Sequence, residues 1–307
     1  MLGIRSTLQK YKAWIGNLLI LRSAKVWKQN RAFYFQLFLK EYDTYQAWIE
    51  PIATSTLPID IIIPAIEKDL MALPYVIEAA RKYIKHPIGN IYIVAPNTPA
   101  IRACAQAAQC EFVNEIDVCN TSKAEIDFVV NGVNRSGWIY QQLLKFNFIK
   151  VGSCTHHLVL DADTVFVKDI VFENGGKYFF DFADEYHTPY YRAYEMLTGL
   201  THTMPISFVS HYMLFSKQML QNLKEHIETH TAKSVEHAII DLKLSITDQS
   251  NFSEYETYAN FCIAKAPQKY SIRYWFNKSC KIEELAKLPL LERSDKWRSI
   301  SFHAYNN

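Results

Sequence analysis

The sequence predicts an α/β domain with a mostly parallel sheet flanked by helices, preceded by an N-terminal helical extension. Two short β-branched runs, 59–64 and 90–96, end in proline, and helical patterns separate them from each other and from a third run. Strands that alternate with helices in this way form a parallel sheet. The length of 307 residues suits one large α/β domain with additions, and 49% apolar and 21% charged residues are typical of a soluble globular protein.

Residues 1–56 are predicted to be a helical extension that ends in a linker between Pro51 and Pro58. The first forty residues carry eight Lys or Arg, no Asp or Glu, and many apolar and aromatic side chains. Such a segment suits an anionic membrane surface, so residues 1–40 are expected to pack on the domain and to make peripheral contact with the membrane. No run reaches the roughly 18 apolar residues of a spanning helix, and no secretory cleavage site is evident.

The six cysteines show no CxxC pairing, which indicates free and mostly buried thiols in a reducing compartment. The expected location is therefore the cytoplasm, at the inner face of the cytoplasmic membrane if the extension binds there. The formal net charge of +2 is small, and no nucleic-acid partner is expected.

Residues 57–170 are predicted to form the first half of the domain. The uninterrupted apolar run 59–64 is typical of a strand that is buried on both faces. The elements that follow are a helix at 73–84, strands at 90–96 and 110–113 with a helix at 99–108 between them, a helix at 135–146 and a strand at 157–160. In the helix at 135–146, Trp138, Gln142 and Lys145 share one face.

Residues 171–307 are predicted to form the second half. Its expected elements are strands at 178–182, 206–210 and 212–215, and helices at 217–230 and 255–264. Ser253 and Glu256 stand three residues apart before the last helix, which predicts a capping box.

Asp161-Ala-Asp163 interrupts an apolar run at the C-terminal end of the strand at 157–160. Ligands of open α/β sheets bind at that end of the strands. Two carboxylates there need a compensating charge. Mn²⁺ or Mg²⁺ would supply it and would bridge the diphosphate of a nucleotide sugar. A surface turn whose Asp side chains bond backbone amides is the structural alternative.

The run from Asp161 to Val165 also resembles the nucleophile motif of haloacid-dehalogenase-type phosphatases. There the first Asp attacks phosphorus and the second is the acid/base. That family carries the motif on its first core strand, whereas three predicted strands precede it here, and Asp184-Glu185 is the only nearby acidic pair. A non-catalytic, membrane-associated protein that binds sugar nucleotides is a third possibility.

Six segments, in this order, resemble a bacterial family of glycosyltransferases: LPIDIIIPAIEKDL, RSGWIYQQLLKF, HHLVLDADTVFV, PISFVSHYMLFSK, FSEYETYANFC and SFHAYNN. The resemblance covers residues 57–307. It implies the A-type glycosyltransferase (GT-A) fold, a Rossmann-like fold with a nucleotide-sugar half at 57–170 and an acceptor half at 171–307. It also implies a UDP-sugar donor in preference to a GDP-sugar, and a glycan or glycolipid acceptor in surface polysaccharide synthesis.

The resemblance assigns donor and metal roles to particular residues. Asp161 and Asp163 would hold the metal and the donor, and His303 would complete the metal site, where imidazole suits Mn²⁺. The remaining donor-binding candidates are Asp60, Pro64, Ala65, Arg135 and Lys145. Structural alternatives exist for four of these assignments. Asp60 would have a strand-edge role, Arg135 and Lys145 would be solvent-facing helix charges, and His303 would lie in a solvated tail.

Glu254 is the candidate general base toward the acceptor hydroxyl. Capping accounts for Ser253 and Glu256 but not for Glu254, which an ordinary helix-dipole contact would also explain. The candidate acceptor-binding residues combine aromatic rings with polar groups, a combination that suits sugars, although local packing would explain them as well; they are Asp184, His187, Tyr191 and His211.

Overall fold

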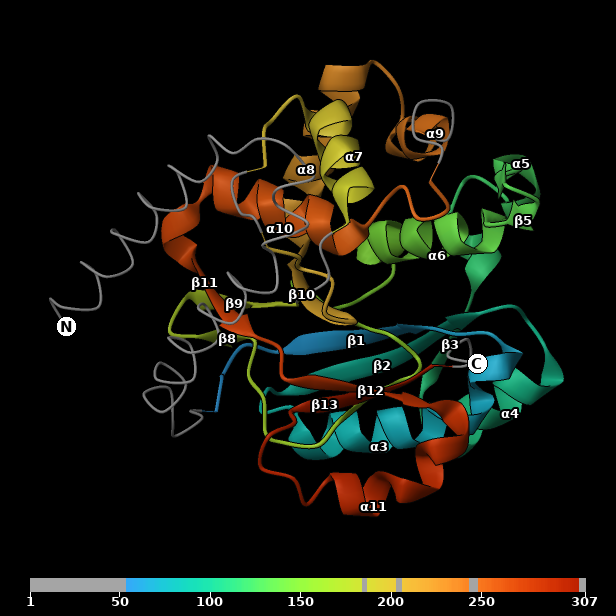
Figure 1. The fold of residues 1–307 in the computed structure, drawn as a ribbon, viewed down its shortest axis with the longest axis vertical. Coiled ribbons are helices and arrows are strands. Elements are labelled where there is room, and N and C mark those ends of the chain that lie inside the picture. The colour runs from blue at the N-terminus through green and yellow to red at the C-terminus, as the bar shows by residue number, and fades with distance from the viewer. Residues whose placement is uncertain (1–53, 184–186, 203–205, 243–247, 304–307) are drawn as a thin grey trace, which may run out of the picture. The chain divides into compact units, whose positions relative to one another are not determined.

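A five-stranded sheet with the order β10-β6-β1-β2-β3 forms the centre of the fold (Figure 1). The computed structural model describes residues 54–183, 187–202, 206–242 and 248–303, so nearly all of the predicted N-terminal extension lies outside it. β1, β2, β3 and β6 are parallel, and β10 is antiparallel to β6. The strands are β1 (Ile59–Pro64), β2 (Ile88–Ala95), β3 (Glu111–Asn114), β6 (His156–Leu160) and β10 (Tyr212–Ser216).

Helices cover both faces of this sheet (Figure 1). One face carries α3 (Leu73–Tyr83) and α4 (Pro99–Ala107). The other carries α6 (Ser136–Asn147), α8 (Lys217–Thr231) and α10 (Glu254–Lys265). The predicted α/β class with a mostly parallel, helix-flanked sheet is therefore confirmed.

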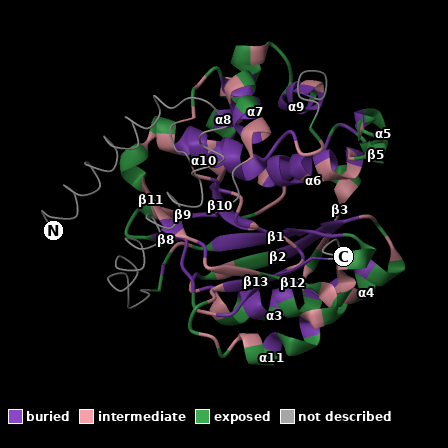
Figure 2. Cartoon of the chain, viewed as in Figure 1, coloured by how far each residue is buried: buried purple, intermediate pink, exposed green. Residues whose placement is uncertain are grey.

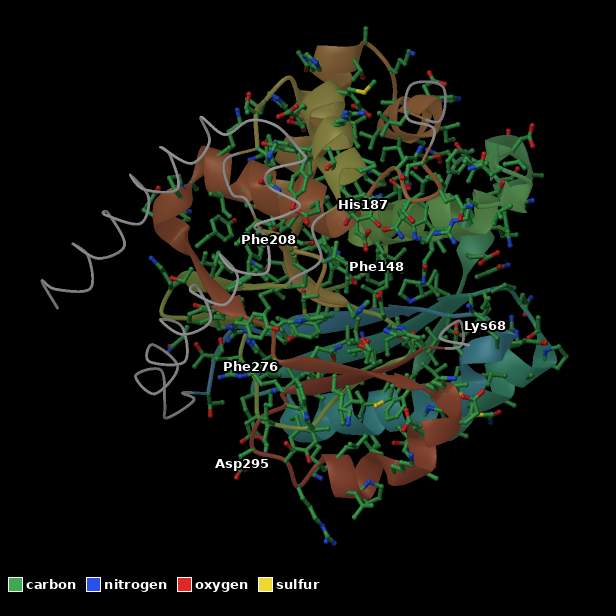
Figure 3. All side chains as sticks on the ribbon, in the orientation of Figure 1. Lys68, Phe148, His187, Phe208, Phe276 and Asp295 are labelled. Atoms are coloured by element: carbon green, nitrogen blue, oxygen red, sulfur yellow. The ribbon has the colours of Figure 1, made fainter. Side chains whose placement is uncertain are left out.

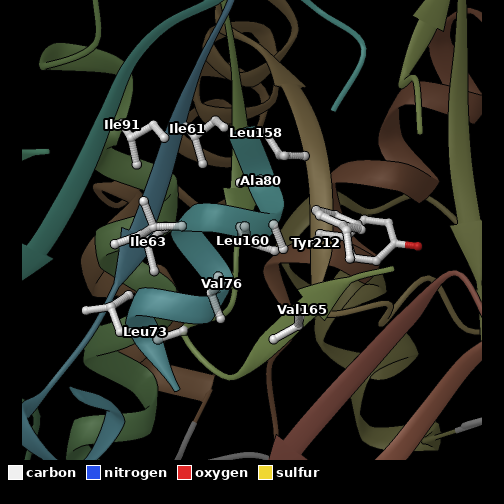
Figure 4. Close-up of a cluster of buried hydrophobic side chains, with 14 of the residues drawn as sticks. Ile61, Ile63, Leu73, Val76, Ala80, Ile91, Leu158, Leu160, Val165 and Tyr212 are labelled. Atoms are coloured by element: carbon white, nitrogen blue, oxygen red, sulfur yellow. The ribbon is translucent and has the colours of Figure 1, made fainter. Parts of the chain in front are cut away.

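The main core lies between the sheet and α3 (Figure 4). Ile61 and Ile63 of β1 and Leu158 of β6 pack there against Val76 of α3. Alternate residues of a strand share a face, and every residue of β1 is buried (Figure 2). Burial of each such side chain contributes about 1.5–3 kcal/mol. This core fixes the ends of β1 and β6, where the Asp pair lies.

The described residues also form two smaller three-stranded sheets and one two-stranded hairpin. In one, β13 (Ser299–His303) pairs with β12 (Asn277–Lys281) and runs antiparallel to β7 (Thr164–Phe166). The other has the order β11-β9-β8, formed by β11 (Tyr270–Tyr274), β9 (Lys177–Phe182) and β8 (Glu173–Asn174). The β13–β7 pairing returns the C-terminal segment to the residues that follow Asp163.

Most predicted elements appear within two residues of their expected ends, but 206–210 is not a strand. Ser207 forms only an isolated bridge with Ala183. The hairpin at 129–134 was also not predicted, although its turn residues Asn131 and Gly132, which both have positive φ, are a typical two-residue hairpin signal. The strands not predicted are β4 (Val129–Val130), β5 (Val133–Asn134), β7, β8, β11, β12 and β13, and the α-helices not predicted are α5 (Lys123–Ile126), α7 (Thr188–Thr198), α9 (Val235–Asp241) and α11 (Leu288–Leu291).

All six cysteines are free thiols, as expected, although only Cys119, Cys262 and Cys280 are buried. Among the described residues, no helix has both the length and the apolar character needed to cross a membrane.

Candidate functional site

Asp161 and Asp163 lie at the carboxyl edge of the central sheet, directly after β6. The Asp161 amide donates to the carbonyl of His211 at 2.9 Å, which joins the end of β6 to the start of β10. Because β1 is parallel to β6, Pro64 and Ala65 end at the same edge, and both are buried. The structure therefore brings these two predicted donor residues to the edge that carries the Asp pair.

Lys145 supplies the compensating charge for Asp161. Its Nζ lies 2.8 Å from Asp161 Oδ1, which also accepts from the Tyr255 hydroxyl at 3.0 Å. The second oxygen, Oδ2, lies 3.1 Å from His211 Nδ1. Burial by itself raises the pKa of Asp161, but the Lys145 ammonium and His211 outweigh it and hold the pKa well below its ordinary value. Asp161 is therefore a firmly held carboxylate.

Lys145 is also paired with Glu254, the first residue of α10. The distance from Nζ to Oε1 is 2.7 Å, and the two side chains are only 3% and 2% exposed. The amide of Gln142 lies against the same carboxylate. Burial raises the pKa of Glu254, and Lys145 opposes this rise. Lys145 does not face solvent, so the alternative of a solvated helix charge is wrong for it. Glu254 lies in the first turn of α10, as the helix-dipole alternative has it, and has a buried ion-pair partner in addition.

His303 lies beside Asp163. Its Nδ1 is 3.1 Å from Asp163 Oδ2, and its side chain is 6% exposed, whereas that of Asp163 is 26% exposed. The Phe302 amide donates to the Asp163 carbonyl at 2.8 Å, next to the β13–β7 pairing. The alternative of a solvated C-terminal histidine is therefore wrong.

His211 was expected in the acceptor surface, and the structure places it against the Asp pair. Its φ of 64° is left-handed, a conformation that costs energy for a residue other than glycine and is frequent at functional sites. Its ring centroid is 5.2 Å from that of His303 and 5.0 Å from that of Trp275. Trp275, in the turn between β11 and β12, had no signal in the sequence beyond its residue type.

Asp69 is a further carboxylate near this edge that sequence reasoning missed. Its carboxylate accepts from the Ile66 amide at 2.9 Å. Burial raises the pKa of Asp69, and repulsion from Asp163 and Asp161 adds to the effect. The position of Asp69, five residues after β1, could have indicated that it follows a strand toward the ligand edge.

Asp60 lies at the other end of β1, where it pairs in register with His157. Its carboxylate accepts from the amides of Cys154 at 2.7 Å and Asn90 at 3.0 Å. Burial opposes ionisation, but these amide donors outweigh it and lower the pKa of Asp60. The structure does not bring Asp60 to the Asp pair, because a residue near the start of a parallel strand lies at the opposite edge. Its contacts fit the strand-edge alternative.

Arg135 also lies away from the Asp pair. It precedes Lys145 by ten residues of α6, or about 15 Å along the helix. Its Nε donates to the Gln249 carbonyl at 2.9 Å, and its guanidinium lies over the Trp138 ring. These contacts tie the start of α6 to the segment before α10.

Two of the remaining acceptor candidates, Tyr191 and His187, are described by the structure, and both are held by backbone carbonyls. Tyr191 is 2% exposed, and its hydroxyl donates to the Ile206 carbonyl at 2.9 Å, so it is a packing residue in this arrangement. His187 lies between α6 and α7 (Figure 3), where its Nε2 donates to the Ser250 carbonyl at 2.6 Å. Asp184 lies outside the described residues.

The predicted capping box is only half formed. The Ser253 hydroxyl caps α10 by accepting from the Glu256 amide at 3.3 Å. The Glu256 carboxylate does not return to Ser253, because it accepts from the Phe208 amide at 2.8 Å. Glu256 is fully buried, and this contact holds the 206–210 segment against α10.

The donor set fits a metal ion that is shared with a phosphate ligand. Two ligands at right angles on an octahedral ion with bonds of about 2.1 Å lie about 3 Å apart, close to the separation of Asp163 Oδ2 and His303 Nδ1. In the part of the chain that the structure describes, no group of three or more His, Cys, Asp or Glu side chains could hold a metal by itself. Mg²⁺-type sites commonly use one or two carboxylates and complete their coordination with phosphates and water.

Comparison with known families finds one that matches residues 57–307 and is described as a family of unknown function, DUF6492. No curated protein matches the chain.

Proposed function

The chain belongs to this family of unknown function, and we propose that it is a metal-dependent glycosyltransferase. It would move a sugar from a nucleoside-diphosphate sugar to a glycan or glycolipid acceptor, on a fold of the GT-A type. The observation that carries the proposal is the Asp163–His303 pair at the ligand-binding edge of the sheet. A carboxylate and an imidazole at this separation suit Mn²⁺, with Mg²⁺ as the second choice.

The charge of the site supports a metal together with an anionic ligand. Four carboxylates lie at this edge, whereas Lys145 offsets Asp161 and Glu254 and Lys68 offsets Asp69; the four belong to Asp69, Asp161, Asp163 and Glu254. A diphosphate would be repelled by this excess of negative charge. A divalent cation reverses the local sign, because its charge is the largest in such a site.

Asp163 and His303 would hold the ion, and Asp161 would face the donor. A metal held by these residues would stabilise the negative charge on the departing nucleoside diphosphate. Asp161 is 19% exposed and its carboxylate is held by Lys145, Tyr255 and His211, so its position is set before a donor arrives.

The donor and the location follow from the resemblance and from the basic N-terminal segment. We propose a UDP-sugar in preference to a GDP-sugar, and an acceptor of surface polysaccharide synthesis. Residues 1–40 would bring the enzyme to the inner face of the cytoplasmic membrane through their Lys and Arg side chains.

The proposal is tested by incubating the full chain and Mn²⁺ with a panel of UDP- and GDP-sugars and with a bacterial membrane glycolipid extract as the acceptor of the sugar, and measuring release of the nucleoside diphosphate. Wild type is expected to release it from one donor, and His303→Ala to lose this activity. A matched control is His237→Ala, which removes an exposed histidine of α9. Phosphate release from a simple ester without nucleotide would instead identify a phosphatase, and donor binding without turnover would identify a binding protein.

A further inference from the structure

We propose that Glu254 is a positioning residue that acts through Lys145 on Asp161, and that it is not the general base. The proposal rests on the proposed function, because the carboxylate that it positions is the one assigned to the donor. It changes the role of the acidic residue that the sequence singled out for proton transfer.

Glu254 cannot reach an acceptor in this arrangement. A general base must come within hydrogen-bond distance of the proton that it removes, directly or through one water. The Glu254 side chain is 2% exposed, Lys145 occupies its Oε1, and the Gln142 amide lies against it. Protein groups therefore occupy the surroundings of the carboxylate and leave it almost no exposed surface.

Lys145 has no donor left for a diphosphate. An ammonium group has three N–H donors. They match three acceptors in this structure: Asp161 Oδ1 at 2.8 Å, Glu254 Oε1 at 2.7 Å and the Tyr255 hydroxyl at 3.4 Å. Because Lys145 is 3% exposed, it is a fixed internal cation and not a ligand-binding lysine.

The three charged groups join three separate elements. Glu254 begins α10, Lys145 lies in the last turns of α6, and Asp161 follows β6. The Tyr255 hydroxyl closes a small ring by donating to Asp161 Oδ1 at 3.0 Å. Removing the Glu254 charge would release one of the anchors of Lys145 and loosen the carboxylate that faces the donor. Groups that orient a binding residue in this way typically change metal affinity by about 10- to 100-fold when they are mutated.

The test is the affinity for UDP or GDP, whichever the wild type binds with Mn²⁺, measured by titration calorimetry without any turnover. The variant is Glu254→Gln, which keeps the shape and removes the charge. Glu256→Gln is the matched control, because it also removes a buried carboxylate from α10. The Glu256 carboxylate contacts Phe208 and Asn260 and not Lys145. Thermal unfolding of both variants measures the purely structural cost.

The dissociation constant of Glu254→Gln is expected to rise by about 10-fold or more, while that of Glu256→Gln stays within twofold of wild type. Glu254→Asp, which keeps the charge on a shorter side chain, is expected to lie in between and replaces Glu254→Gln if that variant does not fold. A general base would leave the dissociation constant unchanged and lower the transfer rate about 10²- to 10⁴-fold, which would overturn this proposal alone. No nucleotide binding by wild type would overturn the proposed function as well.

Discussion

His303 Nδ1 lies 3.1 Å from Asp163 Oδ2, although 140 residues separate them in the chain. The antiparallel pairing of β13 with β7 brings the two together, and the Phe302 amide fixes the register by donating to the Asp163 carbonyl. The contact therefore belongs to the framework of the fold, and a ligand need not assemble it. A site that is formed in advance binds an ion without a large ordering cost.

His303→Ala is expected to weaken Mn²⁺ binding while the protein stays folded. The substitution removes a single imidazole at the C-terminal end of β13. The affinity for Mn²⁺ should fall about 10-fold or more. Electron paramagnetic resonance of free Mn²⁺, titrated with protein in the presence of UDP, measures the bound fraction. Equal Mn²⁺ affinity in wild type and variant would remove His303 from the site.

Lys145→Met is expected to destabilise the fold strongly. The variant leaves the buried Glu254 and the partly buried Asp161 without their cation, and breaking a buried ion pair costs about 3–5 kcal/mol. Urea denaturation at pH 7 measures the loss. Adding Asp161→Asn and Glu254→Gln to Lys145→Met should recover much of it. A loss below about 1 kcal/mol in the single variant would mean that Lys145 is not the compensating charge.

Gly89→Ala is expected to disturb the seat of Asp60. A Cβ at Gly89 would lie 2.6 Å from Asp60 Oδ1 and 2.9 Å from Cys154 Sγ, which are both closer than van der Waals contact. The control is Gly137→Ala in α6, where the added Cβ meets only the end of the Lys123 side chain at 3.2 Å. Overpacking should cost Gly89→Ala about 1–3 kcal/mol in urea denaturation, and the control should cost much less. Equal stability of the two variants would contradict the packing around Asp60.

His157 is expected to make the fold sensitive to acid. It is fully buried in β6, neither ring nitrogen has a hydrogen-bond partner among the described residues, and burial lowers its pKa to about 3. The unfolded chain therefore takes up a proton below its ordinary pKa of 6.5, whereas the folded chain does not, so stability falls as the pH drops from 6.5 toward 3. The expected slope from this residue is about 1.4 kcal/mol per pH unit.

His157→Phe should remove that slope, because the aromatic ring keeps its packing against Phe148 and Phe215 without a titrating group. Urea denaturation gives the free energy of unfolding of both proteins at pH 7 and pH 5. The change between the two pH values is then compared between wild type and His157→Phe. Wild type should lose about 2 kcal/mol more than the variant between these pH values. The same loss in both proteins would show that His157 does not carry the acid sensitivity.

The sequence predicted the central sheet well because its signals are local. The run at 59–64 and its closing proline mark β1, and the position of Asp161 after an apolar strand marks the ligand edge. The sequence could also have shown that Asp60 lies far from Asp161. Asp60 stands at the start of its strand, whereas Asp161 follows the end of a parallel strand, so the two lie at opposite ends of the strands.

The partners of buried charges could not be predicted, because they depend on how distant elements pack. The helical pattern around Lys145 is the same whether its side chain faces solvent or Asp161. The side chain is buried because α10 packs nearby and brings Glu254 to it. Glu256 fits a capping box by spacing, but the Phe208 amide, 48 residues away, takes its carboxylate. The buried position of Tyr191 likewise depends on a distant partner, because its hydroxyl donates to the Ile206 carbonyl.

The role of Asp163 in metal and donor binding is tested by the thermal stabilisation of wild type, Asp163→Ala and Asp295→Ala by UDP and GDP, each with and without Mn²⁺. Asp295 is a fully exposed carboxylate (Figure 3) and is the matched control. A ligand that binds only the folded state raises its stability by about 2.7 kcal/mol at a concentration 100 times its dissociation constant. If Asp163 holds the metal, one nucleotide raises the melting temperature of wild type and of Asp295→Ala in a Mn²⁺-dependent way. The melting temperature of Asp163→Ala does not rise. No rise with either nucleotide, or an equal rise in Asp163→Ala, would contradict this role of Asp163.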